Sequence, residues 1–140
     1  MSVQFFSEDI SFALEQRDLI ASWLIEVASS HQFKVDTLNY IFCSDQYLLE
    51  INNEYLNHDY FTDIITFDNS ESSTHLEGDI FISIDRVQDN ASSLQIDFPQ
   101  ELHRVIIHGL LHLLGYQDKT DSEKKLMREK EEACLSLLKI

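Results

Sequence analysis

Apolar and polar positions alternate over short stretches that predict four strands. Residues 3–6 and 37–43 (TLNYIFC) are rich in β-branched and aromatic residues, which is typical of strands. Residues 63–67 (DIITF) and 79–83 (DIFIS) predict two more strands. The polar stretch 68–78 between them is expected to form a loop or a hairpin connection.

Five further segments carry the spacing or the end signals of helices. The first is expected over residues 9–30, where apolar residues recur at helical spacing: Ile10, Leu14, Ile20, Leu24 and Val27. The other four are expected over residues 45–56, 85–94, 99–114 and 120–138. Ser44 or Asp45 can cap the second helix, and Asp85 the third. Pro99 suits a first helical turn, and Gly115 is a natural stop. Strands and helices in this mixed order predict an α+β fold, with about five helices packed on a small four-stranded sheet.

The composition is that of an ordinary globular protein. A length of 140 residues predicts a single domain, 1–140, that can build its own core. Apolar residues make up 44% and charged residues 25%, while only three glycines and one proline are present. This excludes collagen-like and Gly/Pro-rich disordered classes. No run approaches the roughly 20 apolar residues of a membrane span, so no membrane partner is expected.

The first residues and the cysteines indicate a cellular setting. The opening segment MSVQFFSEDI lacks the basic and apolar regions of a secretory signal. Cys43 and Cys134 have no paired spacing, so a disulfide is not needed. A reduced, cytoplasmic location is therefore expected.

The net charge of −15 is unevenly distributed. Residues 1–97 hold 18 acids and three bases, whereas residues 98–140 hold seven of each. A phosphate backbone would be repelled by the first part and tolerated by the second. Most side chains of residues 121–132 are expected on a solvated helix face with mixed charge pairs.

The segment 105–118 (VIIHGLLHLLGYQD) carries the candidate chemistry. His108 and His112 are four residues apart on an expected helix, so their rings project from one face. Gly115 ends the helix, and Asp118 follows where a third ligand could close the site. Each of these residues is ordinary alone, because a histidine pair can be structural and aspartate is common in turns. Their joint spacing predicts a metal site with three protein ligands, the number typical of catalytic zinc.

The spacing matches the metzincin pattern H-E-x-x-H-x-x-G-x-x-H with two differences. Gly109 replaces the glutamate that serves as general base in such peptidases, so peptidase activity is disfavoured. Asp118 stands where the third histidine would be. A carboxylate from another segment, Asp63 or Asp79, is the candidate catalytic group, although each could equally be an edge or turn residue.

The segment HGLLHLLGYQD closely resembles the H-G-x-L-H-L-x-G-Y-D-H signature of the YbeY family of ribosomal RNA maturation factors. The resemblance extends upstream to Asn52, Glu54, Tyr55, Asp59, 62-TDIITF-67 and 77-EGDIFIS-83. It implies a zincin-like α+β fold with one Zn²⁺ held by His108, His112 and Asp118. It also implies a single-strand-specific endoribonuclease acting in 16S rRNA maturation and ribosome quality control, with ribosome-associated proteins as possible partners.

Three positions depart from the family pattern. Asp118 replaces the usual histidine ligand, Leu56 replaces an arginine, and Phe61 replaces a proline. The lost arginine removes a candidate phosphate clamp, which Arg104 or Lys119 could replace as substrate-binding residues. With the acidic charge, this keeps an alternative open, namely a weakly catalytic or non-catalytic ribosome-assembly adaptor that is stabilised by its metal.

Overall fold

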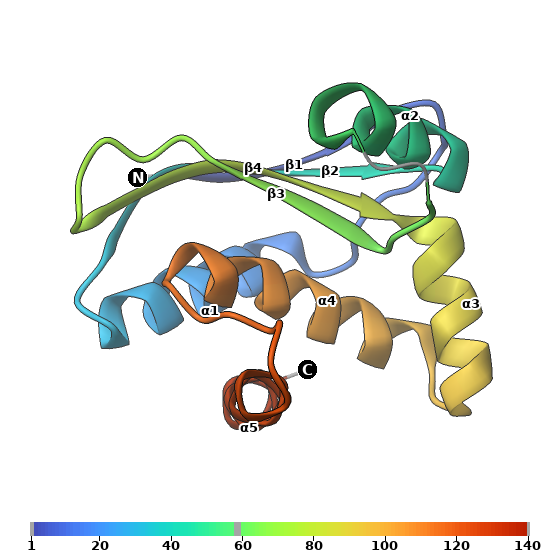
Figure 1. Cartoon of the computed structure of the whole chain (residues 1–140). Helices are drawn as coiled ribbons and strands as arrows, with labels where there is room; N and C mark the ends of the chain where they lie inside the picture. The colour runs from blue at the N-terminus through green and yellow to red at the C-terminus, as the bar shows by residue number, and fades with distance from the viewer. Residues whose placement is uncertain (1, 58–59, 140) are drawn as a thin grey trace.

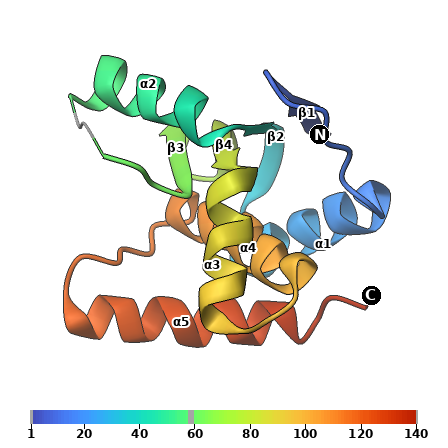
Figure 2. The same cartoon turned by 90° about the vertical axis from the view of Figure 1, so that its right-hand side faces the viewer.

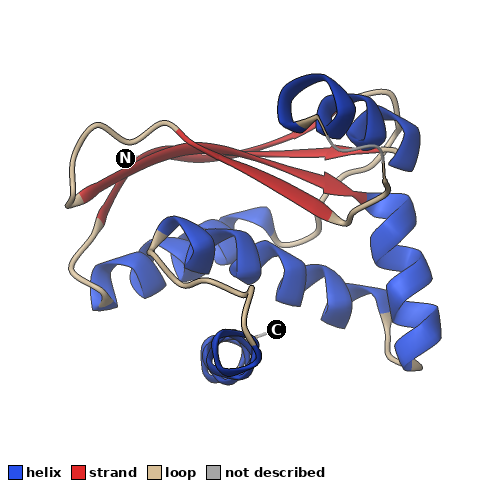
Figure 3. Cartoon of the chain, in the orientation of Figure 1, coloured by secondary structure: helices blue, strands red, loops and turns tan. Residues whose placement is uncertain are grey.

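The computed structural model describes residues 2–57 and 60–139. Within these ranges the chain forms a four-stranded sheet and five helices, which confirms the predicted α+β class (Figure 3). The strands, in the spatial order β1-β2-β4-β3, are β1 (Ser2–Ser7), β2 (Lys34–Cys43), β4 (His75–Ser83) and β3 (Ile64–Asp68). The first two pairings are parallel, whereas β3 and β4 form an antiparallel hairpin.

The helices cover the sheet unequally (Figure 1). Helices α1 (Arg17–Ser30) and α4 (Phe98–Leu113) lie on one face, and α2 (Asp45–Leu56) lies on the other. Helix α3 (Ile84–Leu94) stands at one end of the sheet, and α5 (Asp121–Leu135) packs beneath α4 (Figure 2). No helix of the described part is both long and apolar enough to cross a bilayer.

The main core lies between the sheet and the α1–α4 layer. Alternate residues of β4, including Ile80 and Ile82, are buried against α4 residues such as Ile106 and Leu110. Gly109 permits this close packing, because a Cβ atom there would lie only 3.0 Å from Ile64 and 3.1 Å from Ile80. Gly109 therefore determines how closely α4, which carries His108 and His112, packs on the sheet.

The first helix begins later than its apolar spacing predicts. It starts at Arg17 rather than near residue 9, because Asp9 and Gln16 have left-handed backbone conformations, with φ of 50° and 56°. A helix cannot continue through such residues. Asp9 instead accepts a hydrogen bond from the Ser44 backbone amide at 3.0 Å.

Other element boundaries also differ from the prediction. Strand β4 starts at His75 instead of residue 79, because its polar first half pairs with β2 from Lys34 onward. Ser83, not Asp85, caps α3 by accepting a hydrogen bond from the Arg86 amide at 3.0 Å. The predicted cap of α2 by Ser44 and the hairpin connection between β3 and β4 are confirmed.

Candidate metal centre

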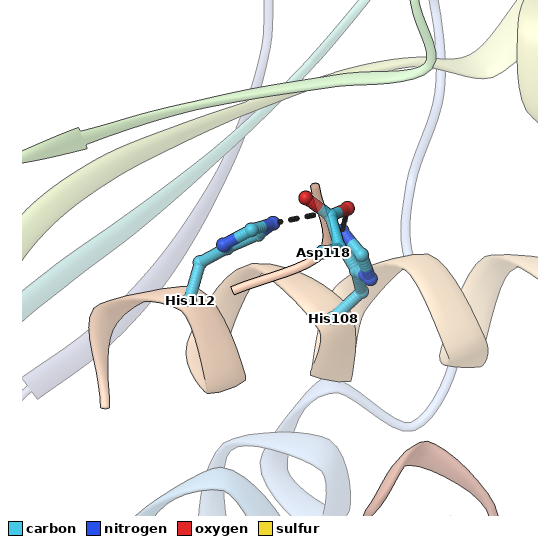
Figure 4. A group of neighbouring side chains, drawn as sticks. All are labelled: His108, His112 and Asp118. Carbon is cyan, nitrogen blue, oxygen red and sulfur yellow. Dashed lines mark ion pairs between the residues drawn. The ribbon is translucent and has the colours of Figure 1, made fainter. Parts of the chain in front are cut away.

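Helix α4 presents His108 and His112 side by side, as their spacing predicts. Their ring centroids are 4.6 Å apart, and both rings project from α4 toward Asp118 (Figure 4). The helix ends at Leu113, and Gly115 takes a φ of 111°, which glycine adopts without strain. The chain then turns back so that Asp118 faces both imidazoles.

The three side chains lie close enough together to hold one metal ion. The Asp118 Oδ2 atom lies 3.4 Å from His108 Nε2 and 3.5 Å from His112 Nε2, and the ligand atoms of all three residues fall within 4.8 Å of one another. The two distances from Asp118 are longer than the donor–acceptor distances of good N–H···O hydrogen bonds. They equal the ligand–ligand distance of about 3.4 Å expected for a tetrahedral ion with bonds of about 2.1 Å. The donor set of two imidazoles and one carboxylate suits Zn²⁺.

The surroundings of the two histidines affect their protonation and hydrogen bonding. Burial and the nearby His108 lower the pKa of His112, which favours the neutral imidazole that a metal requires. Glu131 of α5 forms a 2.6 Å hydrogen bond with Nδ1 of His108. Burial alone would raise the pKa of Glu131, but the bond to His108 and the charge of Arg104 outweigh it and hold the pKa below its ordinary value.

The turn that carries Asp118 is anchored to the first helix. Tyr116 shares a hydrogen bond of 3.1 Å with His31, which lies at the end of α1. The rings of these residues also pack edge to face. Tyr116 therefore packs beside the turn, and His31 holds it to the end of α1.

The two candidate catalytic carboxylates lie on different sides of the sheet. Asp63, just before β3, approaches Arg104 of α4 at 4.0 Å. Burial raises the pKa of Asp63 more than Arg104 and His108 lower it. Asp79 lines a cavity of about 470 Å³ between α2 and the sheet, where Asn39 and Asn69 donate hydrogen bonds to it. Only Asp63 is therefore on the metal side of the sheet.

Basic side chains gather beside the triad. Lys119 directly follows Asp118 and is exposed. A cavity of about 240 Å³ next to His108 and Asp118 is lined by Lys124 and Arg128 of α5. Arg104 also reaches this cavity, but its guanidinium is held by Glu101 and Glu131.

Glu131 and Glu101 are the site residues that the sequence did not predict. Glu131 belongs to the charged segment 121–132, most of which is expected to face solvent, yet it is only 2% exposed. A signal exists in the pattern, since Glu131 lies between Met127 and Cys134 at the i, i+4, i+7 spacing of a buried helix stripe. A charge on such a stripe indicates a buried partner.

Comparisons with known proteins agree with this geometry. The sequence matches the family model described as Endoribonuclease YbeY over residues 2–139. The chain belongs to the endoribonuclease YbeY family. It is 56% identical over 138 residues to Endoribonuclease YbeY of Cytophaga hutchinsonii, covering 99% of this chain and 96% of that protein. It is 44% identical to the protein of the same name from Parabacteroides distasonis, with the same coverage.

A solved structure shares the fold. The solution structure of TM1509 from Thermotoga maritima superposes with a TM-score of 0.68 at 27% identity. The match covers 96% of this chain and 87% of that one. Asp59, which helps to carry the YbeY resemblance, lies outside the described residues.

Proposed function

We propose that this protein is a metal-dependent endoribonuclease that cleaves single-stranded ribosomal RNA during maturation of the small ribosomal subunit. The observation that carries the proposal is the convergence of the ligand atoms of His108, His112 and Asp118 within 4.8 Å of one another. Membership of the YbeY family supplies the reaction class. Action in the cytoplasm, within a single domain and as part of ribosome quality control, remains a prediction.

The metal in this proposal is one Zn²⁺ held by the two imidazoles and the carboxylate. When bound, it supplies a Lewis acid that polarises the scissile phosphate and lowers the pKa of bound water. Asp118 contributes a negative charge where a third histidine would be neutral. This charge donation predicts a less acidic bound water than a three-histidine site would give.

The chain's own groups have complementary roles. Asp63 is the proposed proton acceptor, because it lies on the metal side of the sheet and burial raises its pKa toward a more basic carboxylate. Asp79 receives no role in the reaction because it faces α2. Lys119 is the proposed substrate-binding residue beside the triad, and Lys124 and Arg128 extend the basic surface for phosphates. Arg104 is not given a phosphate contact, since carboxylates already hold its guanidinium.

Cleavage of a labelled single-stranded RNA tests the proposal. The zinc-loaded protein should cut it, a chelator should abolish cutting, and added Zn²⁺ should restore it. His112→Ala should lower the rate at least about 100-fold, since second-shell changes alone cost 10–100-fold and a lost ligand should cost more. His75→Ala, on β4, is the matched control and should cut normally. No cutting by the loaded wild type, or equal rates for His112→Ala and the wild type, would contradict the proposal.

One observation favours the adaptor function as the second candidate. Leu56, at the end of α2, is 42% exposed where the family pattern has an arginine, so this end of the helix has lost a phosphate-binding group. An adaptor predicts that His112→Ala lowers the melting temperature, while ribosome association continues without cleavage. Unchanged folding of the metal-free protein would count against this function.

A further inference from the structure

A carboxylate is buried directly behind the candidate metal centre. Glu131 of α5 is 2% exposed, and its Oε2 atom lies 2.6 Å from Nδ1 of His108. The opposite ring nitrogen, Nε2, faces Asp118 at 3.4 Å. The two nitrogens of His108 therefore have different partners, one in the metal triad and one in the protein interior.

The orientation of Glu131 is fixed by a second buried pair. Glu101, which is 0% exposed, accepts two hydrogen bonds from Arg104, at 2.9 Å from Nε and 2.7 Å from Nη2. This fork leaves Nη1 of Arg104 to donate to the other oxygen of Glu131 at 3.2 Å. Each oxygen of Glu131 thus accepts from a different donor, so the carboxylate cannot rotate without losing one bond.

We propose that Glu131 is a positioning residue for the metal centre, and that Arg104 and Glu101 hold it in place. Glu131 accepts the Nδ1 proton of His108 and so keeps Nε2 unprotonated and directed at the metal. The proposal rests on the metal centre described under the proposed function. The proposal gives Arg104 a structural role on the buried side of the metal centre. This role agrees with its side chain being only 19% exposed.

The network also joins two elements that are separate in the sequence. Helix α4 carries Glu101, Arg104 and His108, whereas α5 carries Glu131. The correct docking of α5 on α4 is therefore required for His108 to present Nε2. Carboxylates that orient metal-binding histidines in this way typically change metal affinity 10–100-fold when mutated.

The test compares Zn²⁺ affinity in Glu131→Gln and in Glu132→Gln, measured by competition with a chromogenic chelator. An amide has one acceptor oxygen, but Arg104 and His108 present two donors, so Glu131→Gln must lose one of the bonds. We expect it to bind Zn²⁺ 10–100-fold more weakly than the wild type. Glu132 is the exposed neighbour on the same helix, and Glu132→Gln should bind as the wild type does.

A second measurement uses the zinc-loaded wild type. Its long-range ¹H–¹⁵N spectrum should show His108 protonated at Nδ1, with this proton protected from exchange, and unprotonated at Nε2. This readout stands even if Glu131→Gln does not fold. Protonation at Nε2, or wild-type affinity in Glu131→Gln with only a lower melting temperature, would overturn the positioning role alone. Failure of the wild type to bind Zn²⁺ would overturn the metal centre and this inference together.

Discussion

Gly78 and Gly109 both allow close packing, but against different kinds of neighbour. Gly78 lies within β4, and a Cβ atom there would be 2.7 Å from the carbonyl oxygen of Phe67 in β3. Gly109 is different, because its nearest atoms are the ends of the Ile64 and Ile80 side chains. A backbone carbonyl cannot move without separating the strands, whereas side-chain ends can shift.

We therefore predict that Gly78→Ala lowers the free energy of unfolding by about 1–3 kcal/mol, the usual cost of overpacking. Gly109→Ala should cost less, because the helical preference of alanine over glycine, about 1 kcal/mol, offsets part of the crowding. Urea denaturation of both variants checks this order. Equal stability of Gly78→Ala and the wild type would contradict the role given to the Phe67 carbonyl.

The sequence predicts the candidate metal ligands but not the side chains that hold them in place. His108 and Asp118 are ten positions apart, with His112 between them, on a helix and its following turn, so local geometry alone brings them together. Glu131 approaches His108 only through the packing of α5 on α4, which no local spacing reveals. Asp79 and Ile80 are neighbours in a strand, so their side chains are expected on opposite faces of the sheet. The alternation does not tell which of these faces packs against α4.

At the scale of elements, the sequence predicts every described helix and strand, and the differences lie at their ends. The early start expected for α1 is wrong, because the apolar residues Ile10 and Leu14 pack on the core from an irregular segment. Periodicity records burial, and a non-helical segment can also bury residues at that spacing. The start of α5 is defined by local chemistry, and there the prediction at Thr120 or Asp121 is confirmed.

A capping box closes the N-terminus of α5. Thr120 accepts a hydrogen bond from the Glu123 amide at 3.1 Å, and Glu123 accepts one from the Thr120 amide at 2.9 Å. Thr120→Ala should lower the free energy of unfolding by about 1 kcal/mol, as expected for a lost cap. Thr120→Ser retains the acceptor and is the control. Thermal unfolding compares them, and equal melting temperatures for all three proteins would show that the cap is dispensable.

For the whole molecule, the neutral C-terminal part of the chain stays together in space, although α1 of the acidic part lies on the same face of the sheet. The neutral part of the chain, residues 98–140, forms α4 and α5, and lies on the side of the sheet that holds the metal triad (Figure 1). The net negative charge belongs to residues 1–97, which form the sheet and the other helices. The approach of RNA along the C-terminal third, expected from the sequence, thus leads to the same side as the candidate metal centre.

The salt dependence of RNA binding tests this arrangement. Single-stranded RNA affinity should fall with salt with a log–log slope of about −0.7 for each phosphate contacted. Replacing Lys124 and Arg128 together by alanine should weaken binding and reduce the steepness of the slope by about 1.4, since two contacts are lost. The control replaces Arg17 and Lys34, two exposed bases of the acidic part, and should retain the wild-type slope. Titrations of a fluorescent RNA in the presence of chelator measure binding without cleavage. Equal slopes for the two double variants would place the RNA on another surface, because each variant loses two positive charges.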